Sequence, residues 1–155
     1  MVYGRCNIIN GDSKIFRETK TIPFNLLDYA YGLFTIPQQA TFWRRNIFFK
    51  VGMFNIKNHT CMDGELWLKF AKNKANIKYV NKVLANFRLH PHSISGSGRL
   101  SKQYYRDRVK IQRNLLGYNP NRLRTLLRRL SFLIRHPIFH VRYYFFSLSK
   151  KSFII

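Results

Sequence analysis

Short apolar segments alternate with turn signals along the first half of the chain. Residues 2–9 are mostly apolar and have the length of a strand, and the Asn-Gly-Asp sequence at 10–12 is a strong turn signal. Together with the β-like residues 14–17, this pattern predicts a hairpin. Residues 24–34 space their apolar side chains as a helix does, and residues 46–52 predict a short helix that ends at a glycine.

The middle of the chain changes from helix to strand. After the polar loop 53–59, the segment that begins at Asp63 carries apolar residues on one helical face. Acidic residues open this helix and lysines close it, as the helix dipole favours. Residues 77–80 and 83–90 predict two strands, and the Ser- and Gly-rich residues 91–98 predict a loop.

The last third of the chain predicts basic amphipathic helices. One is expected at 99–117, and one or two more at 121–149, which His136-Pro137 interrupts because proline cannot continue the hydrogen-bond ladder. Aromatic residues interleave with arginines here, which suits a helix in a membrane interface, a surface for single-stranded nucleic acid, or a stripe packed on further protein. We favour the membrane, because the aliphatic clusters 126–127 and 130–134 recur every turn, which base stacking does not require.

The charge of the chain favours a polyanionic partner. Its 155 residues include 28 Lys and Arg against 6 Asp and Glu, a formal net charge of +22. Residues 99–155 carry 14 basic residues and one acid, a net of +13, whereas residues 1–98 carry 14 and five, a net of +9. The excess is denser in the last third, and nucleic acid, an anionic membrane face and phosphorylated substrates are all compatible with it.

Composition excludes several other classes of protein. With 46% hydrophobic residues, including 14 Phe and 9 Tyr, the chain is not wholly disordered, and its length suits one domain or two small ones. Cys6 and Cys61 are too few for a disulfide scaffold and form no CxxC metal pattern, so a reducing compartment is expected. The start has no signal-peptide pattern, and no apolar run reaches the ~18 residues that span a bilayer.

Asp63 is the main candidate for chemistry. It lies in the expected first turn of a helix, beside Gly64. Asp63 and Glu65, two of the six acidic residues of the chain, occur together there. Nearby cations favour the ionised form of such a carboxylate, and an ionised carboxylate near phosphate-binding groups can take a proton from an attacking hydroxyl. The alternative is that Asp63 only caps the helix.

Four blocks of the sequence resemble the C-terminal half of a family 2 glycosyltransferase with the GT-A fold. They occur in the expected order and with compatible spacing: Ile36–Arg45, Val51–Asn55, Met62–Lys69 and Phe87–Ser93. The resemblance covers residues 1–98. It implies an α/β fold, a partial GT-A (Rossmann-like) domain, followed by a basic helical extension at 99–155.

The resemblance also implies an activity. Members of the family transfer a sugar, with inversion, from a nucleotide sugar to a glycan or lipid-linked acceptor, and they commonly use a divalent metal, Mn or Mg. Asp63 matches the general base, and His90 matches a histidine that contacts the metal or the diphosphate. Other matched positions would line the donor and acceptor cleft: Gln38, Gln39, Thr41, Glu65 and Trp67.

Two of these assignments have simpler alternatives. Arg44 and Arg45 suit a diphosphate because arginine presents a fork of donors, but they also suit a solvated basic face. His90, at the end of a strand, can simply bond the backbone. A helical metal pair at His136 and His140 is disfavoured, because a proline separates them and no acid or cysteine lies near.

The sequence departs from the family in two respects. Gly64 stands where the family usually has an aromatic residue, which alters the acceptor pocket. The nucleotide-binding half has no counterpart before Tyr3, and no Asp-x-Asp, the principal metal motif, occurs anywhere. The chain is therefore expected to be a fragment, a truncated product or one piece of a split enzyme, with low activity in isolation.

The sequence thus predicts a glycosyltransferase fragment at the cytoplasmic face of the membrane, bound peripherally to anionic lipid, with no specific nucleic acid as partner. The alternatives are a basic nucleic-acid-binding module and a catalytically inactive remnant that docks on a membrane or on a partner transferase.

Overall fold

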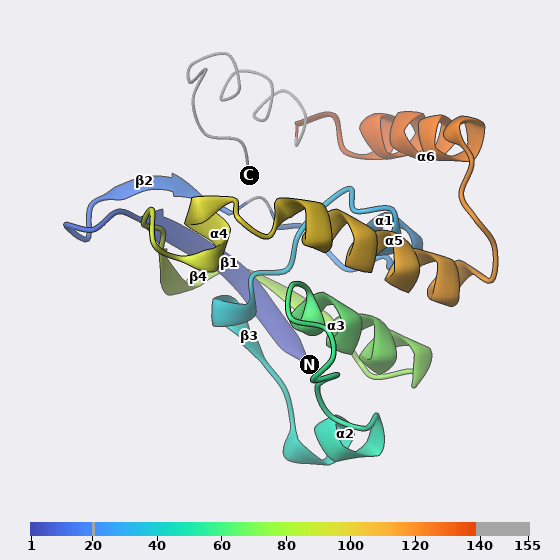
Figure 1. The fold of residues 1–155 in the computed structure, drawn as a ribbon, viewed down its shortest axis with the longest axis horizontal. Coiled ribbons are helices and arrows are strands. Elements are labelled where there is room, and N and C mark those ends of the chain that lie inside the picture. The colour runs from blue at the N-terminus through green and yellow to red at the C-terminus, as the bar shows by residue number, and fades with distance from the viewer. Residues whose placement is uncertain (20, 139–155) are drawn as a thin grey trace.

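The computed structural model describes residues 1–19 and 21–138 as a mixed α/β fold (Figure 1). Four strands form one sheet around β1 (Val2–Ile9). β4 (Lys78–Arg88) runs parallel to β1 along nearly its whole length. β2 (Ile15–Glu18) and β3 (Thr41–Phe42) pair antiparallel with opposite ends of β1. Because a strand has only two edges, β2 and β3 share the edge that β4 leaves free.

The predicted hairpin is confirmed. β1 and β2 pair antiparallel across the Asn-Gly-Asp turn, with Ile8 opposite Arg17. The amide of Lys14 donates to the side-chain oxygen of Asn10, so the asparagine bonds its own turn.

The two strands expected around Asn81-Lys82 are one continuous strand, β4, so that prediction is wrong. The register against β1 shifts between Tyr3 and Cys6, which places extra residues of β4 in a bulge. Gly4 lies at this point, and a Cβ there would be 2.6 Å from the carbonyl oxygen of Lys82. Asn81 and Lys82 therefore belong to a bulge against a glycine, where a break between two strands was expected.

The helices follow the sequence pattern with shifted ends. α1 (Leu26–Ala30) is shorter than the apolar segment that predicted it, and α2 (Arg45–Lys50) ends before Gly52, whose φ of +78° is left-handed, as expected for a helix stop. α3 (Met62–Lys72), α5 (Ser101–Leu116) and α6 (Arg122–Arg135) confirm the remaining helices within the described part of the chain. Within the expected loop 91–98, Ser93 caps the short helix α4 (Ile94–Ser97). Any helix beyond residue 138 lies outside the described residues.

The core joins the sheet, α3 and α6. Its buried members are the following: Tyr3, Phe34, Ile36, Leu66, Trp67, Phe70 and Phe132. Phe132 belongs to α6, so the basic helical region packs onto the first 98 residues. α5 runs past α1, and α6 turns back in the opposite direction (Figure 1). Among the described residues, no helix is both long enough and apolar enough to cross a membrane.

Candidate functional site

The carboxylate of Asp63 stands in the first turn of α3, half-buried. Its Oδ1 accepts a hydrogen bond of 2.7 Å from the backbone N–H of Gly64. Burial raises the pKa of Asp63 above its ordinary value of 3.8, and the backbone N–H groups of Gly64 and of Asp63 itself partly oppose that shift. Among the residues that the structure describes, none forms an ion pair with Asp63. The described polar partners of the Asp63 carboxylate are therefore backbone N–H groups at the start of the helix.

Tyr29 of α1 lies against this turn. Burial and the negative charge of Asp63 raise the pKa of the Tyr29 phenol well above its usual value, and Arg108 opposes the shift. A Cβ added to Gly64 would lie 3.2 Å from the Tyr29 hydroxyl oxygen. The space beside Gly64 is thus bounded by an aromatic residue from another helix.

Helix α5 contacts the loop that leads into α3. The Thr60 hydroxyl, just before α3, donates to Asp107 of α5 at 2.7 Å, and Gln103 donates to the other oxygen of that carboxylate at 2.8 Å. The guanidinium of Arg108 occupies the space that a side chain at Gly32 would fill, with Nη2 only 1.0 Å from an ideal Cβ. Residues of α1 and of α5, a part of the basic region, therefore lie near the Asp63 turn.

Glu65 is on the same helical turn as Asp63 but has a different role in this structure. Both of its oxygens accept from Nδ2 of Asn55, at 3.1 Å, and one also accepts from Nδ2 of Asn58 at 2.8 Å. The buried Asn58 in turn accepts from the backbone N–H of Cys61 at 3.1 Å. Glu65 thereby holds the loop that leads into α3, so its acceptor oxygens are already used within the chain.

Trp67 does not line a cleft in this structure. Its side chain has no exposed surface and packs against Trp43 with ring centroids 5.2 Å apart. The expectation that Trp67 lines the cleft is therefore wrong. Helical spacing places position 67 on the apolar face of α3, which packs into the core.

Of the three predicted cleft residues that follow Pro37, two are exposed and one is buried. Gln38 and Gln39 are exposed in the 3₁₀ turn η1 (Gln38–Ala40). Thr41 is buried, and its hydroxyl donates to the carbonyl of Pro37 at 2.7 Å. The two glutamines are available to a ligand, whereas the threonine closes the turn that presents them.

Arg44 and Arg45 are exposed at the start of α2. Arg44 borders a concavity of about 690 Å³ beside the edge strand β3, which Lys50 and Lys78 also line. Arg45 lies over the ring of Phe49 at 5.2 Å. The lining of the concavity contains three basic side chains and no acid, among mostly apolar residues.

The described residues do not assemble a metal site. His90 is exposed beyond the end of β4, and its ring centroid lies 6.3 Å from that of His92. In the described part of the chain, no three His, Cys, Asp or Glu side chains come close enough to hold an ion. His136 packs on Phe132 at 4.8 Å, and His140 lies outside the described residues. We therefore assign no step to a metal bound by these residues.

The structure brings some of the predicted residues together and separates others. Asp63 and Glu65 share one turn, and Arg44 shares a concavity with two lysines, but no described interaction joins either arginine, or His90, to Asp63. Sequence reasoning missed Tyr29 and Arg108. Tyr29 sits within an apolar helical pattern and Arg108 within a dense basic run, so nothing in their spacing distinguishes them.

Comparisons with known proteins do not extend this description. No protein-family model matches the chain, and neither a curated protein nor a solved structure matches it. The resemblance to family 2 glycosyltransferases therefore rests on the four sequence blocks alone.

Proposed function

We propose that the chain forms the acceptor side of a family 2 type glycosyltransferase with a GT-A fold, and that Asp63 is its general base. One observation carries the proposal: a half-buried carboxylate at the first turn of a helix, without an ion-pair partner among the described residues, beside Tyr29 and α5. The coarse α/β architecture agrees with it, and the four sequence blocks supply the reaction class.

The reaction would be a direct displacement. Asp63 takes the proton of an acceptor hydroxyl as that oxygen attacks the anomeric carbon, and the bond from that carbon to the nucleotide diphosphate breaks with inversion. The raised pKa of Asp63 makes the carboxylate a stronger base than an exposed aspartate. The two exposed glutamines of η1 remain the proposed contacts of the sugars, and Arg44 and Arg45 those of the diphosphate.

The proposed acceptor is a glycan or a lipid-linked sugar at the cytoplasmic face of the membrane. The charge of +22 favours an anionic surface, and the basic helix α5 contacts the loop that leads into the Asp63 turn. A divalent metal, if the reaction uses one, is expected to come with the donor and its binding half.

Complementation of a cell extract tests the proposal. An extract of source cells from which the gene is deleted supplies the acceptor and any partner chain, and it is incubated with a panel of radiolabelled nucleotide sugars and Mn²⁺. Adding the purified wild-type chain should restore incorporation of one sugar, and Asp63→Asn should lower the rate at least ~100-fold, as loss of a general base does. The matched control is Asp12→Asn, which removes an exposed carboxylate from the β1–β2 turn and should restore wild-type incorporation. Equal rates for Asp63→Asn and wild type would refute the assignment of the base.

Binding of nucleic acid is the second candidate, because α5 exposes rings and cations together. Tyr104 and Tyr105 are exposed by 37% and 60%, and Lys102 and Arg106 flank them. This candidate expects binding to RNA or single-stranded DNA that survives physiological salt and prefers a sequence or a structure. Binding that disappears at physiological salt would reflect only the net charge.

A further inference from the structure

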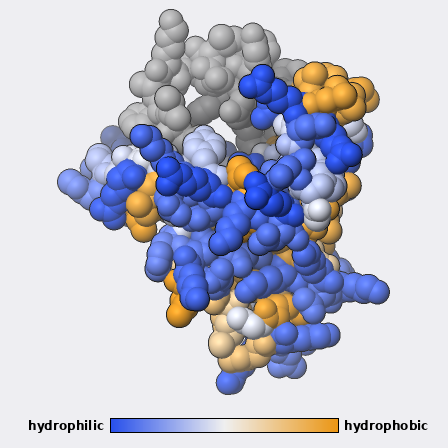
Figure 2. Space-filling model, turned by 45° about the vertical axis from the view of Figure 1, so that its right-hand side comes forward, coloured by the Kyte–Doolittle hydropathy of each residue, from blue (hydrophilic) through white to orange (hydrophobic). Residues whose placement is uncertain are grey.

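Helix α6 presents a continuous apolar face to solvent. Its members, here called the leucine face, are Leu123, Leu126, Leu127, Leu130, Leu133 and Ile134. Their spacing of three and four residues places them on one side of the helix. All are exposed, and Ile134 is 80% exposed. Figure 2 shows hydrophobic surface at the upper right, where Figure 1 places α6, bordered by hydrophilic atoms.

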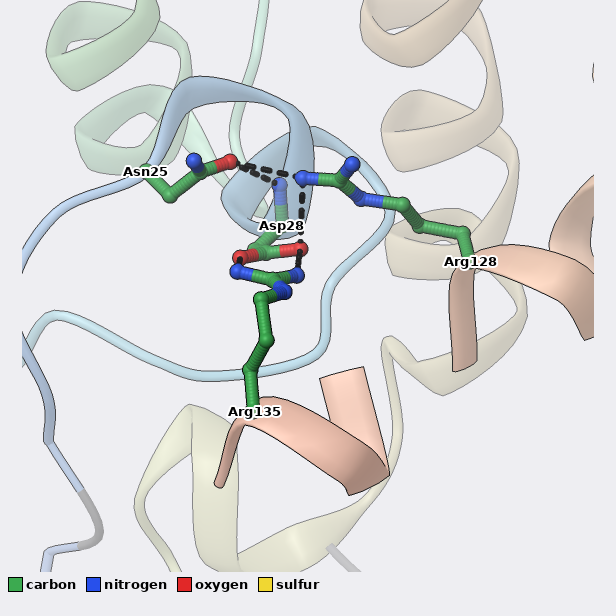
Figure 3. Close-up of polar contacts among 4 residues, drawn as sticks. All are labelled: Asn25, Asp28, Arg128 and Arg135. Atoms are coloured by element: carbon green, nitrogen blue, oxygen red, sulfur yellow. Dashed lines mark hydrogen bonds and ion pairs between the residues drawn. The ribbon is translucent and has the colours of Figure 1, made fainter. Parts of the chain in front are cut away.

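The opposite side of α6 is anchored to the rest of the protein. Phe132 is 1% exposed and belongs to the core. Asp28 of α1, which is completely buried, accepts hydrogen bonds of 2.9 and 2.8 Å from Arg135 and forms an ion pair with Arg128 at 2.7 Å (Figure 3). These contacts fix the rotation of α6 about its axis, so the leucine face is directed outward by the fold itself.

Arginines border the leucine face on both sides. Helical geometry places Arg122 and Arg129 along one border and Arg124 along the other. The sequence has no Asp or Glu after Asp107, so no acidic side chain beyond that point offsets this charge. A second copy of the chain on this face would bring arginines against arginines, whereas an anionic bilayer offers hydrocarbon to the leucines and phosphate to the arginines.

The dimensions of α6 suit a position in the plane of a bilayer. Its 14 residues extend for ~21 Å, which is less than the ~30 Å hydrocarbon core. A strong separation of apolar and basic faces is typical of helices that lie in the membrane interface.

We propose that α6 is the membrane-contacting element of the protein and lies in the interface of an anionic bilayer. The leucine face enters the acyl region, and Arg122, Arg124 and Arg129 meet lipid phosphates. This inference rests on the proposed function, which places the protein at a membrane, and it deepens that function by naming the element that makes the contact. Helices α1 and α5 connect this surface to the Asp63 turn. A lipid-linked acceptor would then reach the site from the membrane that α6 contacts.

Vesicle sedimentation with the full chain tests the inference. Wild type is expected to bind phosphatidylcholine vesicles containing 30 mol% phosphatidylglycerol about tenfold or more tighter than pure phosphatidylcholine vesicles, since each surface cation adds about fivefold. The variant Leu126→Ser/Leu130→Ser/Ile134→Ser should weaken binding to the anionic vesicles by about tenfold or more. These positions are exposed, so the variant should keep the wild-type circular dichroism spectrum.

A matched pair of single variants separates α6 from general hydrophobicity. Ile134 and Ile56 are 80% and 81% exposed, and Ile56 lies in the loop before α3. Ile134→Ser should weaken vesicle binding about threefold, whereas Ile56→Ser should leave it unchanged. Arg122→Gln/Arg129→Gln should remove most of the preference for phosphatidylglycerol.

Three outcomes would overturn the inference: equal binding by the triple variant and wild type, equal binding to both kinds of vesicle, or a wild-type dimer that the triple variant dissociates without any vesicle binding. Asp63→Asn should bind vesicles as wild type does. Loss of transfer with intact binding and loss of binding with intact chemistry are therefore distinguishable results.

Discussion

The guanidinium of Arg135 donates to both carboxylate oxygens of Asp28, a residue 107 positions earlier in the chain, at 2.9 and 2.8 Å. Asp28 is fully buried, whereas the Arg135 side chain is 38% exposed and reaches solvent. The hydrogen bond to Asp28 raises the pKa of Arg135 above its ordinary value. This contact joins the first helix of the chain to the last described one.

Asp28→Asn should detach α6 from α1. The amide cannot accept from two arginines as a carboxylate does. We therefore expect the free energy of unfolding to fall by about 3 kcal/mol. This value is at the lower end for a broken buried ion pair, because both arginine side chains can reach solvent. Denaturant unfolding measures this loss, and hydrogen exchange should show α6 amides exchanging faster. The control Glu18→Gln breaks the exposed pair with Arg5 and should cost less than ~1 kcal/mol. Equal costs for the two variants would contradict the structural role of Asp28.

Asp63→Asn should stabilise the protein at neutral pH. The folded state raises the pKa of this carboxyl by burial, so above that pKa folding has to bury a charge, which opposes folding. As the pH falls from neutral through the folded pKa towards 3.8, wild type binds a proton preferentially when folded and gains stability relative to the variant. Thermal unfolding of both proteins at several pH values should therefore show a difference at pH 7 that shrinks near pH 4. A variant less stable than wild type at pH 7 would show that Asp63 is a structural residue.

Gly64→Ala should destabilise the protein although alanine favours a helix. The added Cβ would lie 3.2 Å from the hydroxyl of Tyr29, whose ring is held between Phe24 and Phe34 at centroid distances of 5.9 and 5.5 Å. We expect the free energy of unfolding to fall by about 1 kcal/mol, whereas helix propensity alone would raise it by about 1 kcal/mol. In a Tyr29→Phe background, which removes the hydroxyl, the same substitution should become neutral or stabilising. A stabilising Gly64→Ala with no coupling to Tyr29 would disprove the close approach.

Gly4→Ala should disturb the bulge between β1 and β4. Its Cβ would meet the carbonyl oxygen of Lys82 at 2.6 Å, and backbone atoms cannot move aside as a flexible side chain can. We expect a cost of about 2 kcal/mol by urea denaturation. Gly11→Ala is the control, because nothing lies within 4 Å of its Cβ position, and it should change stability by less than ~0.5 kcal/mol.

Local pattern predicted most elements of the fold, but pattern alone could not place their partners. The hairpin followed from Asn10 and Gly11, and α3 from its apolar face, because both signals depend on neighbouring residues. The sequence predicted two separate strands where β4 is continuous with a bulge, since only the approach of Gly4 from a distant strand distinguishes a bulge from a break.

The candidate site shows the same division. The position of Asp63 in a first helical turn was predictable, whereas its surroundings come from α1 and α5, which lie more than thirty residues away in sequence. Glu65 and Trp67 matched the family by spacing, but spacing does not reveal that one binds two asparagines and the other fills the core.

Glycan analysis of source cells in which the codon for Asp63 specifies Asn tests the account most directly, because every natural partner and acceptor is then present. Mass spectrometry of lipid-linked and surface glycans should show the same missing sugar in this strain as in a deletion strain, with the variant protein at wild-type abundance. A strain carrying Asp12→Asn should keep the sugar. A complete glycan profile in the Asp63→Asn strain, alongside a defective one in the deletion strain, would contradict the role of Asp63 as the base.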